Sequence, residues 1–143
     1  MKNIIKHISK LGIFLVVTTV SVHAYSEIAV VVNVNNDSEL SKSDIKKIYL
    51  AKKRTFPNSS PVVMLDQPSG SKIKKEFGKE LLGKDQRRLK AYWSRLIFTG
   101  KATPPEEMAS DEEIKKFVAL NPDAIGYIDA QSVDNSVKVI YKF

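Results

Sequence analysis

The chain has 143 residues and no cysteine, which excludes disulfide bonds, thiolate chemistry and a lipoprotein anchor on cysteine. Its 23 lysine and arginine residues exceed its 16 aspartate and glutamate residues, so the formal net charge is +7. A basic surface of this kind attracts anions in general, among them phosphate, lipid headgroups and polyanionic glycans. The length is that of one domain with one modest hydrophobic core.

The first 24 residues have the pattern of a secretory signal peptide. Several lysines precede an apolar segment at residues 11–22, and residues 22–24 resemble a small-residue cleavage site. An uncleaved anchor is the less favoured alternative, because the apolar run is too short to cross a bilayer. We therefore expect a signal peptide at residues 1–24 and one exported, periplasmic domain at residues 25–143, with no stable membrane anchor after cleavage. Nucleic acid is not an expected partner of an exported chain.

A strand and a helix are predicted after the signal peptide. Residues 28–32 form a continuous apolar and β-branched run, which is typical of a strand buried on both faces. Ser41 and Asp44 fit a capping box, the signal for a helix N-terminus. The helix ends near residues 51–54, where cations suit the negative end of the helix dipole. Its predicted apolar face carries Ile45, Ile48 and Tyr49.

A second strand, a tight turn and a second helix follow. Residues 62–65 are apolar, and Pro68 and Gly70 interrupt the chain after them. The helix that begins at Lys72 has apolar residues at intervals of four, and Gly83 is placed to cap its C-terminus. These apolar residues are Ile73, Phe77 and Leu81.

Two more helices and two strands complete the predicted elements. A helix at residues 85–100 is expected to bury an apolar face made of Leu89, Tyr92 or Trp93, Leu96 and Ile97. Ser110 and Glu113 fit a second capping box at the start of the next helix. Residues 124–128 and 137–141 have the composition of strands. The alternation of strands and helices predicts an α/β layer structure.

The turn before Lys72 is the best-supported candidate site, and the expected ligand is an anion. N–H groups in the first turn of a helix lack intrahelical partners and attract negative charge. Gly70 leaves room for an oxyanion to approach the backbone. The hydroxyls of Ser69 and Ser71 add donors, and Lys72 adds a nearby cation. In the structural alternative, Ser69 or Ser71 only caps the helix and Gly70 only serves the turn.

The sequence argues against an enzyme. After cleavage of the signal peptide the chain has neither histidine nor cysteine, so the usual nucleophile–base pairs and the commonest metal ligands are missing. The carboxylates do not have the spacing of a calcium loop. We expect no metal and no cofactor. Two weaker candidates are Trp93 with Arg95, and Gly126-Tyr127. A core role is favoured for Trp93, and the alternative for Arg95 is an ordinary exposed cation. A glycine within a strand marks a close backbone approach or a bulge, or it only makes room for a helix.

Several segments resemble phosphate-type periplasmic substrate-binding proteins. AVVVN at Ala29–Asn33 and LSKSDIKKIYLAK at Leu40–Lys52 are similar to the start of one lobe of that family. SGS at Ser69–Ser71 stands where the family often has Ser-Gly-Thr at a phosphate-binding helix. The family also has a phenylalanine six residues later, which here is Phe77.

Segments near the C-terminus extend this resemblance. NPDAIGYID at Asn121–Asp129 is similar to the family's Asn-Pro-Gly-Ala-Ile-Gly-Tyr strand. YWSRLIFTG at Tyr92–Gly100 and TPP at Thr103–Pro105 resemble a short, single-lobe branch of the family. The likeness covers nearly all of residues 29–139, and the order of the motifs is more specific than any one of them.

The resemblance implies one lobe of a type 2 periplasmic-binding-protein-like fold, with a mixed sheet flanked by helices. It implies recognition of an inorganic oxyanion, with phosphate as the expected ligand, in ABC-transporter-linked uptake or sensing. The implied partners are an ABC permease or an envelope sensor protein. Full-length members close two lobes around the ligand, so one lobe would bind weakly unless a partner or a second copy, as in a homodimer, covers the open face.

The turn departs from the family's pattern at two positions. The family commonly has an arginine four residues before the first serine of Ser-Gly-Thr and an acidic residue two before it, where this sequence has Leu65 and Gln67. Leucine cannot make charge-assisted, bidentate contacts with phosphate. Asp66 can supply an acceptor for a protonated oxyanion. The alternative function is therefore a ligand-free protein-interaction module of the cell envelope, derived from one lobe of a binding protein.

Overall fold

The computed structural model describes residues 26–143. The predicted signal peptide at residues 1–24 lies outside the described residues. Within the described part of the chain, no helix combines the length and the apolar character needed to cross a membrane.

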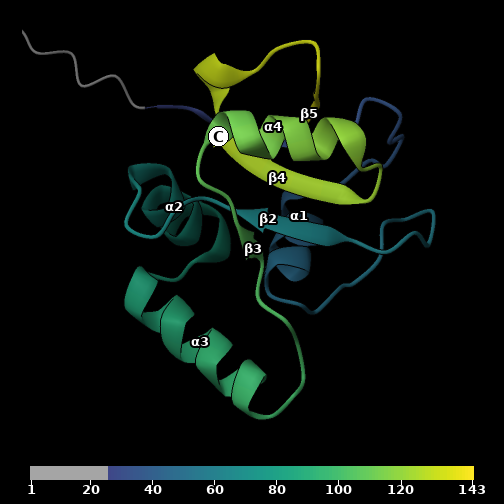
Figure 1. The fold of residues 1–143 in the computed structure, drawn as a ribbon. Coiled ribbons are helices and arrows are strands. Elements are labelled where there is room, and N and C mark those ends of the chain that lie inside the picture. The colour runs from purple at the N-terminus through teal and green to yellow at the C-terminus, as the bar shows by residue number, and fades with distance from the viewer. Residues whose placement is uncertain (1–25) are drawn as a thin grey trace, which may run out of the picture.

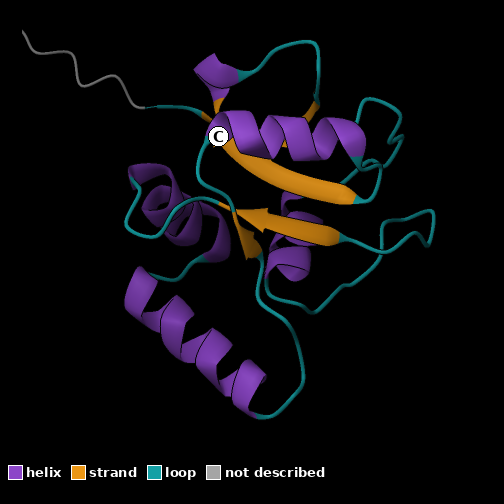
Figure 2. Ribbon diagram, in the orientation of Figure 1, coloured by secondary structure: helices purple, strands orange, loops and turns teal. Residues whose placement is uncertain are grey.

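The described residues form one five-stranded mixed sheet with helices on both faces (Figures 1 and 2). The strand order is β3-β2-β4-β1-β5. Strand β2 runs parallel to β3 and β4, whereas β1 runs antiparallel to β4 and β5. The predicted α/β fold with a mixed sheet is confirmed. The elements are β1 (Ile28–Val32), α1 (Lys42–Tyr49), β2 (Val63–Asp66), α2 (Lys72–Glu76), η1 (Phe77–Leu82), α3 (Gln86–Phe98), β3 (Glu106–Glu107), α4 (Asp111–Leu120), β4 (Ala124–Asp129), η2 (Ala130–Ser132) and β5 (Lys138–Lys142).

Strand β1 sends its side chains alternately into two hydrophobic clusters. Ile28, Val30 and Val32 pack in the cluster that contains the apolar residues of α1 and η1. Ala29 and Val31 pack in the cluster that contains those of α4. All five side chains are buried, as predicted for this run. The sheet is therefore covered on both faces, with α4 on the near face in Figure 1.

Three aromatic rings lie beneath the C-terminal end of β2. Phe77 and Tyr127 stack with their ring centroids 3.7 Å apart and their planes at 6°. Tyr49 meets both rings edge-on, at 4.8 Å from Phe77 and 5.7 Å from Tyr127. Its hydroxyl donates to the carbonyl oxygens of Leu65 and Ile125, at 3.0 and 3.2 Å. These contacts fix α1 and η1 against neighbouring strands and so hold the end of β2 in place.

The predicted helix caps hold with one correction. Ser41 and Asp44 form the reciprocal capping box, and Gly83 ends its helix in the left-handed region at φ 68°. The second box is only half present. Ser110 accepts from the backbone N–H of Glu113 at 3.2 Å. The Glu113 carboxylate, however, accepts from Ala109 at 2.9 Å, one residue before the cap, because the chain enters this helix with Ser110 fully extended.

Three features differ from the sequence prediction. Helix α3 has no fully buried residue, and Ile97 is 52% exposed, since only the inner part of its apolar face reaches the rest of the domain. The helix after Lys72 becomes a π-helix at Phe77. There Gly78 lets α3 approach closely, because an added Cβ would lie 2.8 Å from the Cδ1 atom of Leu89. The two-residue strand β3 is too short for periodicity to indicate.

Gly126→Ala is expected to destabilise the domain, because the added Cβ would lie 2.5 Å from the Cγ2 atom of Ile114 in the packed core. Overpacking of this kind costs about 1–3 kcal/mol, which urea unfolding can measure. In a double variant with Ile114→Ala, the loss of stability should be smaller than the sum of the two single losses. Additive losses would contradict the contact as the cause.

Candidate anion-binding site

Five polar side chains from separate elements meet at the C-terminal end of β2. They line one end of a cavity of about 520 Å³. Asp66 lies on β2, Ser69 in the turn after it, and Lys74 on α2. Glu107 lies on β3 and Tyr127 on β4. Because parallel strands β2 and β3 pair Asp66 with Glu107, two carboxylates emerge side by side at this edge of the sheet.

The ammonium group of Lys74 lies between these two carboxylates. Its Nζ atom is 2.9 Å from Asp66 and 3.1 Å from Glu107, and the lysine side chain is only 18% exposed. Burial alone would lower the pKa of Lys74, but the hydrogen bonds and charges of Asp66 and Glu107 outweigh burial and raise that pKa above its ordinary value. Lys74 is therefore a firmly charged cation at the centre of the site.

The Glu107 carboxylate accepts hydrogen bonds from two donors of this site. The Ser69 hydroxyl donates to its Oε2 atom at 2.6 Å, and Lys74 contacts the same oxygen. The Ser69 hydroxyl, the Ser69 backbone N–H and then Lys74 lower the pKa of Glu107 to about 2. This donor set can hold one oxygen of any carboxylate or phosphate.

Tyr127 and Gln67 hold the Asp66 carboxylate in place by hydrogen bonds. The Tyr127 hydroxyl donates to the Oδ1 atom of Asp66, and the Gln67 backbone N–H donates to the same atom at 2.9 Å. Burial, followed by the negative charge of Asp66, raises the pKa of Tyr127 well above its usual range, so the phenol remains a donor. The Gln67 side chain is also buried and donates to the Tyr127 carbonyl oxygen and to Asp111, both at 2.7 Å.

The structure brings two of the five predicted residues, Asp66 and Ser69, into this cavity. Ser71 instead caps α2, accepting from the backbone N–H of Lys74 at 3.2 Å, which is the structural alternative considered for it. Gly70 lies at the exposed tip of the turn with φ 81°. Lys72 is exposed and its ammonium lies 3.6 Å from Glu76.

The sequence did not predict Lys74 and Glu107, which pair with each other at the site. Lys74 lies among several lysines of one helix, and nothing in the local pattern distinguishes it from its neighbours. Glu107 reaches the site only because β3 pairs with β2. Tyr127 had a signal, since the sequence singled out Gly126-Tyr127 as a place of close backbone approach.

The rest of the cavity lining is mostly apolar. Helix α3 contributes Leu89 and Trp93 together with the polar Gln86 and Lys90, η1 contributes Leu82, and the loop before β3 contributes Pro104 and Pro105. Leu89 and Trp93 are half-buried, because the cavity separates part of the helix from the sheet. Trp93 therefore lines the cavity and is only partly buried, whereas the sequence favoured a place in the core.

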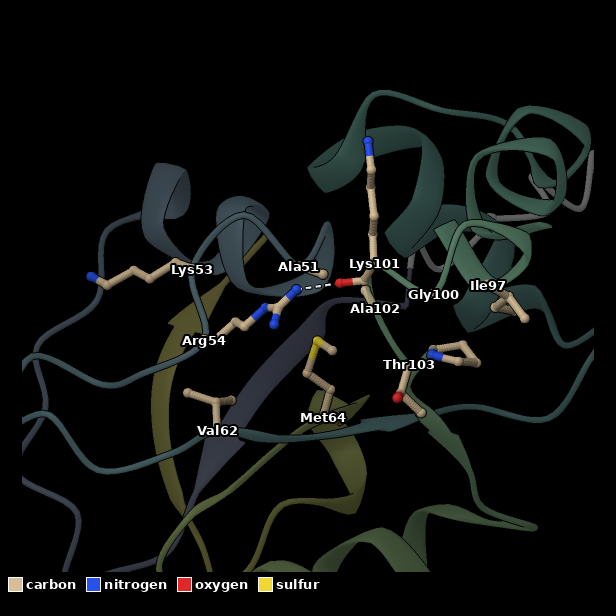
Figure 3. Close-up of a pocket in the computed structure, with 11 residues that line it drawn as sticks. Ala51, Lys53, Arg54, Val62, Met64, Ile97, Gly100, Lys101, Ala102 and Thr103 are labelled. Atoms are coloured by element: carbon tan, nitrogen blue, oxygen red, sulfur yellow. Dashed lines mark hydrogen bonds between the residues drawn. The ribbon is translucent and has the colours of Figure 1, made fainter. Parts of the chain in front are cut away.

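A second cavity, of about 580 Å³, lies between the end of α1, strand β2 and the loop after α3 (Figure 3). Met64 supplies an apolar side chain from β2, and Val62 supplies one from the residue before that strand. Arg54 donates to the backbone oxygen of Lys101 across the rim. The side chain of Lys53 points outward in Figure 3. None of the predicted anion-binding residues lines this cavity.

Comparison with solved structures identifies the fold. The structure is similar to an ABC-type phosphate transport receptor from Vibrio cholerae, with a TM-score of 0.62 and 22% identity over 79% of this chain. It is similar to a protein from Clostridium perfringens assigned as a phosphate ABC transporter substrate-binding protein and solved with bound phosphate, with a TM-score of 0.64 and 26% identity over 80% of this chain. PstS from Borrelia burgdorferi matches with a TM-score of 0.58 and 13% identity over 80% of this chain. The chain has the fold of phosphate ABC transporter substrate-binding proteins.

The match covers less than half of each of these proteins. The aligned part is 44%, 45% and 47% of their lengths, in the same order. This agrees with the single lobe expected from the sequence. A scan against models of known protein families and a search of curated proteins both find no match. The similar structures are transport receptors and substrate-binding proteins rather than enzymes.

The ionised contacts of Glu107 should make stability depend on pH. Because its pKa is lower in the folded state, these contacts stabilise the fold fully above its usual value of 4.5, and the stabilisation is lost as the pH falls toward about 2. Glu107 is half exposed, so we expect less than about 1 kcal/mol.

Urea unfolding of wild type and Glu107→Gln at about pH 6, 4 and 3 measures this contribution. The wild type should be the more stable at pH 6, and the difference should shrink as the pH falls. Glu106→Gln, the exposed neighbour in β3, is the matched control and should show no such trend. A Glu107 difference that stays constant with pH would contradict the prediction.

Proposed function

We propose that this domain recognises an oxyanion of the phosphate class at the polar end of the 520 Å³ cavity. The observation that carries the proposal is the capture of the Glu107 carboxylate by Ser69 and Lys74. Those donors already surround an anionic oxygen, so a phosphate oxygen could replace the carboxylate without any new donor. The fold shared with phosphate-type substrate-binding proteins supports the same class of ligand.

The neighbouring groups suit a phosphate that has displaced Glu107. Asp66 could accept a hydrogen bond from a protonated phosphate oxygen, as inferred from the sequence. Gly70 would present its backbone N–H beside the turn, and nothing lies within 4 Å of the position that a Cβ on Gly70 would take. The Ser71 N–H already donates to the Pro68 carbonyl oxygen at 3.1 Å, so it would have to exchange that bond for one to the anion. Lys72 would contribute charge at longer range, in exchange for its exposed contact with Glu76.

We expect weak binding by the isolated domain. Leu65 is fully buried and apolar, so it offers no charge where the related family places arginine. Glu107 competes for the two principal donors, and its carboxylate repels an incoming anion. A dissociation constant near the millimolar range, about −4 kcal/mol, is the expected order of magnitude.

The biological setting belongs to the same proposal. A periplasmic domain with this fold would deliver or report its anion to an ABC permease or an envelope sensor protein. A second copy or a partner that covers the open side of the cavity would raise the affinity by excluding water from the charged groups. The predicted signal peptide and the structural relatives support export.

Titration calorimetry of residues 25–143 with phosphate tests the site. Glu107→Gln should bind phosphate about tenfold more tightly, a change of about 1.4 kcal/mol, because the competing charge is removed. Ser69→Ala should bind more weakly, since one donor to a charged group is worth about 1.5–3 kcal/mol. The matched control Glu106→Gln makes the same change of charge in the same strand and should leave the affinity within about twofold. No heat from millimolar phosphate in any folded variant would contradict the proposal.

One observation favours the alternative of a protein-interaction module. Phe98 is 92% exposed and follows Ile97, so the end of α3 presents large apolar side chains to solvent. In this alternative, cross-linking in the envelope fraction should give one discrete product that Phe98→Ser abolishes and Glu107→Gln leaves unchanged. A product that depends on phosphate or on Glu107 would instead favour the anion-binding function.

A further inference from the structure

The cavity is much larger than an inorganic oxyanion requires. Its volume is about 520 Å³, within the range of roughly 300–1,000 Å³ found for organic ligands. A phosphate ion fills only a few times the roughly 30 Å³ of a water molecule. An ion held at Ser69 and Lys74 would therefore leave most of the cavity empty.

The part that would remain empty is lined by apolar groups on one side. Leu89 and Trp93 lie on consecutive turns of α3 and face the cavity, with Pro105 nearby. The Trp93 ring packs edge-on against Tyr92, with the two ring centroids 5.7 Å apart. Since α3 has no fully buried side chain, a ligand with an apolar body would cover surface that the domain itself leaves half exposed.

The charges place the anionic group at one end. Lys74 and Lys90 both line the cavity, as do Asp66 and Glu107. These four charges cancel while Glu107 stays in place, and the cavity becomes net positive once an incoming anion displaces it. An amine would not displace Glu107. Ser69 and Lys74 would then keep their contacts with the Glu107 carboxylate and would not bind the amine.

We propose that the ligand of this cavity is an organic phosphate, a monoester or a phosphonate with an apolar or aromatic substituent. Its phosphate group takes the place of the Glu107 carboxylate at Ser69 and Lys74, and its substituent lies against Trp93 and Leu89. This inference rests on the proposed oxyanion function and adds the class of substituent.

Trp93 is the chain's only tryptophan, so its fluorescence reports directly on this wall of the cavity. Phenyl phosphate, butyl phosphate, inorganic phosphate, phenol and benzylamine are titrated into residues 25–143, with calorimetry in parallel. The two esters should bind at least tenfold more tightly than inorganic phosphate and shift the Trp93 emission. Phenol and benzylamine should do neither.

Trp93→Ala should remove the advantage of the esters and leave the affinity for inorganic phosphate unchanged. If the alanine variant unfolds, Trp93→Leu takes its place, because it keeps an apolar side chain. In Trp93→Leu, the affinity for phenyl phosphate should fall more than the affinity for butyl phosphate. Phe98→Ala, which removes an exposed aromatic ring from the same helix outside the cavity, is the matched control and should change nothing.

The outcomes separate the two proposals. Equal affinity for esters and inorganic phosphate would overturn the organic substituent and leave the oxyanion site standing. Binding of benzylamine or phenol as tight as that of phenyl phosphate would also overturn it, because the phosphate group would then contribute nothing. If no phosphate compound binds even to Glu107→Gln, the oxyanion function itself fails.

Discussion

The ammonium group of Lys74 holds two carboxylates that would otherwise repel each other across the pairing of β2 with β3. Asp66 and Glu107 lie opposite each other in these parallel strands, and Lys74 lies within about 3 Å of both. Without this cation, the two-residue strand at the edge of the sheet would place like charges side by side. The position of β3, the loop before it and one end of the cavity therefore depend on a residue of α2.

The same contact gives the site its chemical character. A lysine and a serine hydroxyl that converge on one carboxylate oxygen form a donor set for an anion, and the chain's own Glu107 fills it. Beneath it, the stacked rings of Phe77 and Tyr127 fix the acceptor Asp66 through the tyrosine hydroxyl. Under the proposed function, an external ligand would compete with this internal one. The competition would link the edge of the sheet to ligand affinity, because displacing Glu107 removes its contact with Lys74.

The elements that the sequence predicted well carry local signals. The buried run of β1, the capping box at Ser41 and the left-handed cap at Gly83 each depend on a few adjacent residues. Helix α3 was placed correctly, yet a periodic apolar face cannot tell whether anything covers it, and Ile97 proved half exposed. Glu107 lies 33 residues beyond Lys74 in a strand of two residues, so only the tertiary fold brings the pair together. Local patterns therefore found the turn but not its charged partners.

The central claim is that an oxyanion binds by replacing Glu107. Carbon-13 NMR of the Glu107 side-chain carboxyl, titrated with acid in the absence and presence of saturating phosphate, tests it most directly. Without phosphate, the carboxyl should titrate near its lowered pKa of about 2. With phosphate bound, Glu107 loses Ser69 and Lys74 as partners, so its pKa should rise toward the ordinary value of 4.5. A carboxyl that keeps its low pKa while phosphate binds would contradict the account.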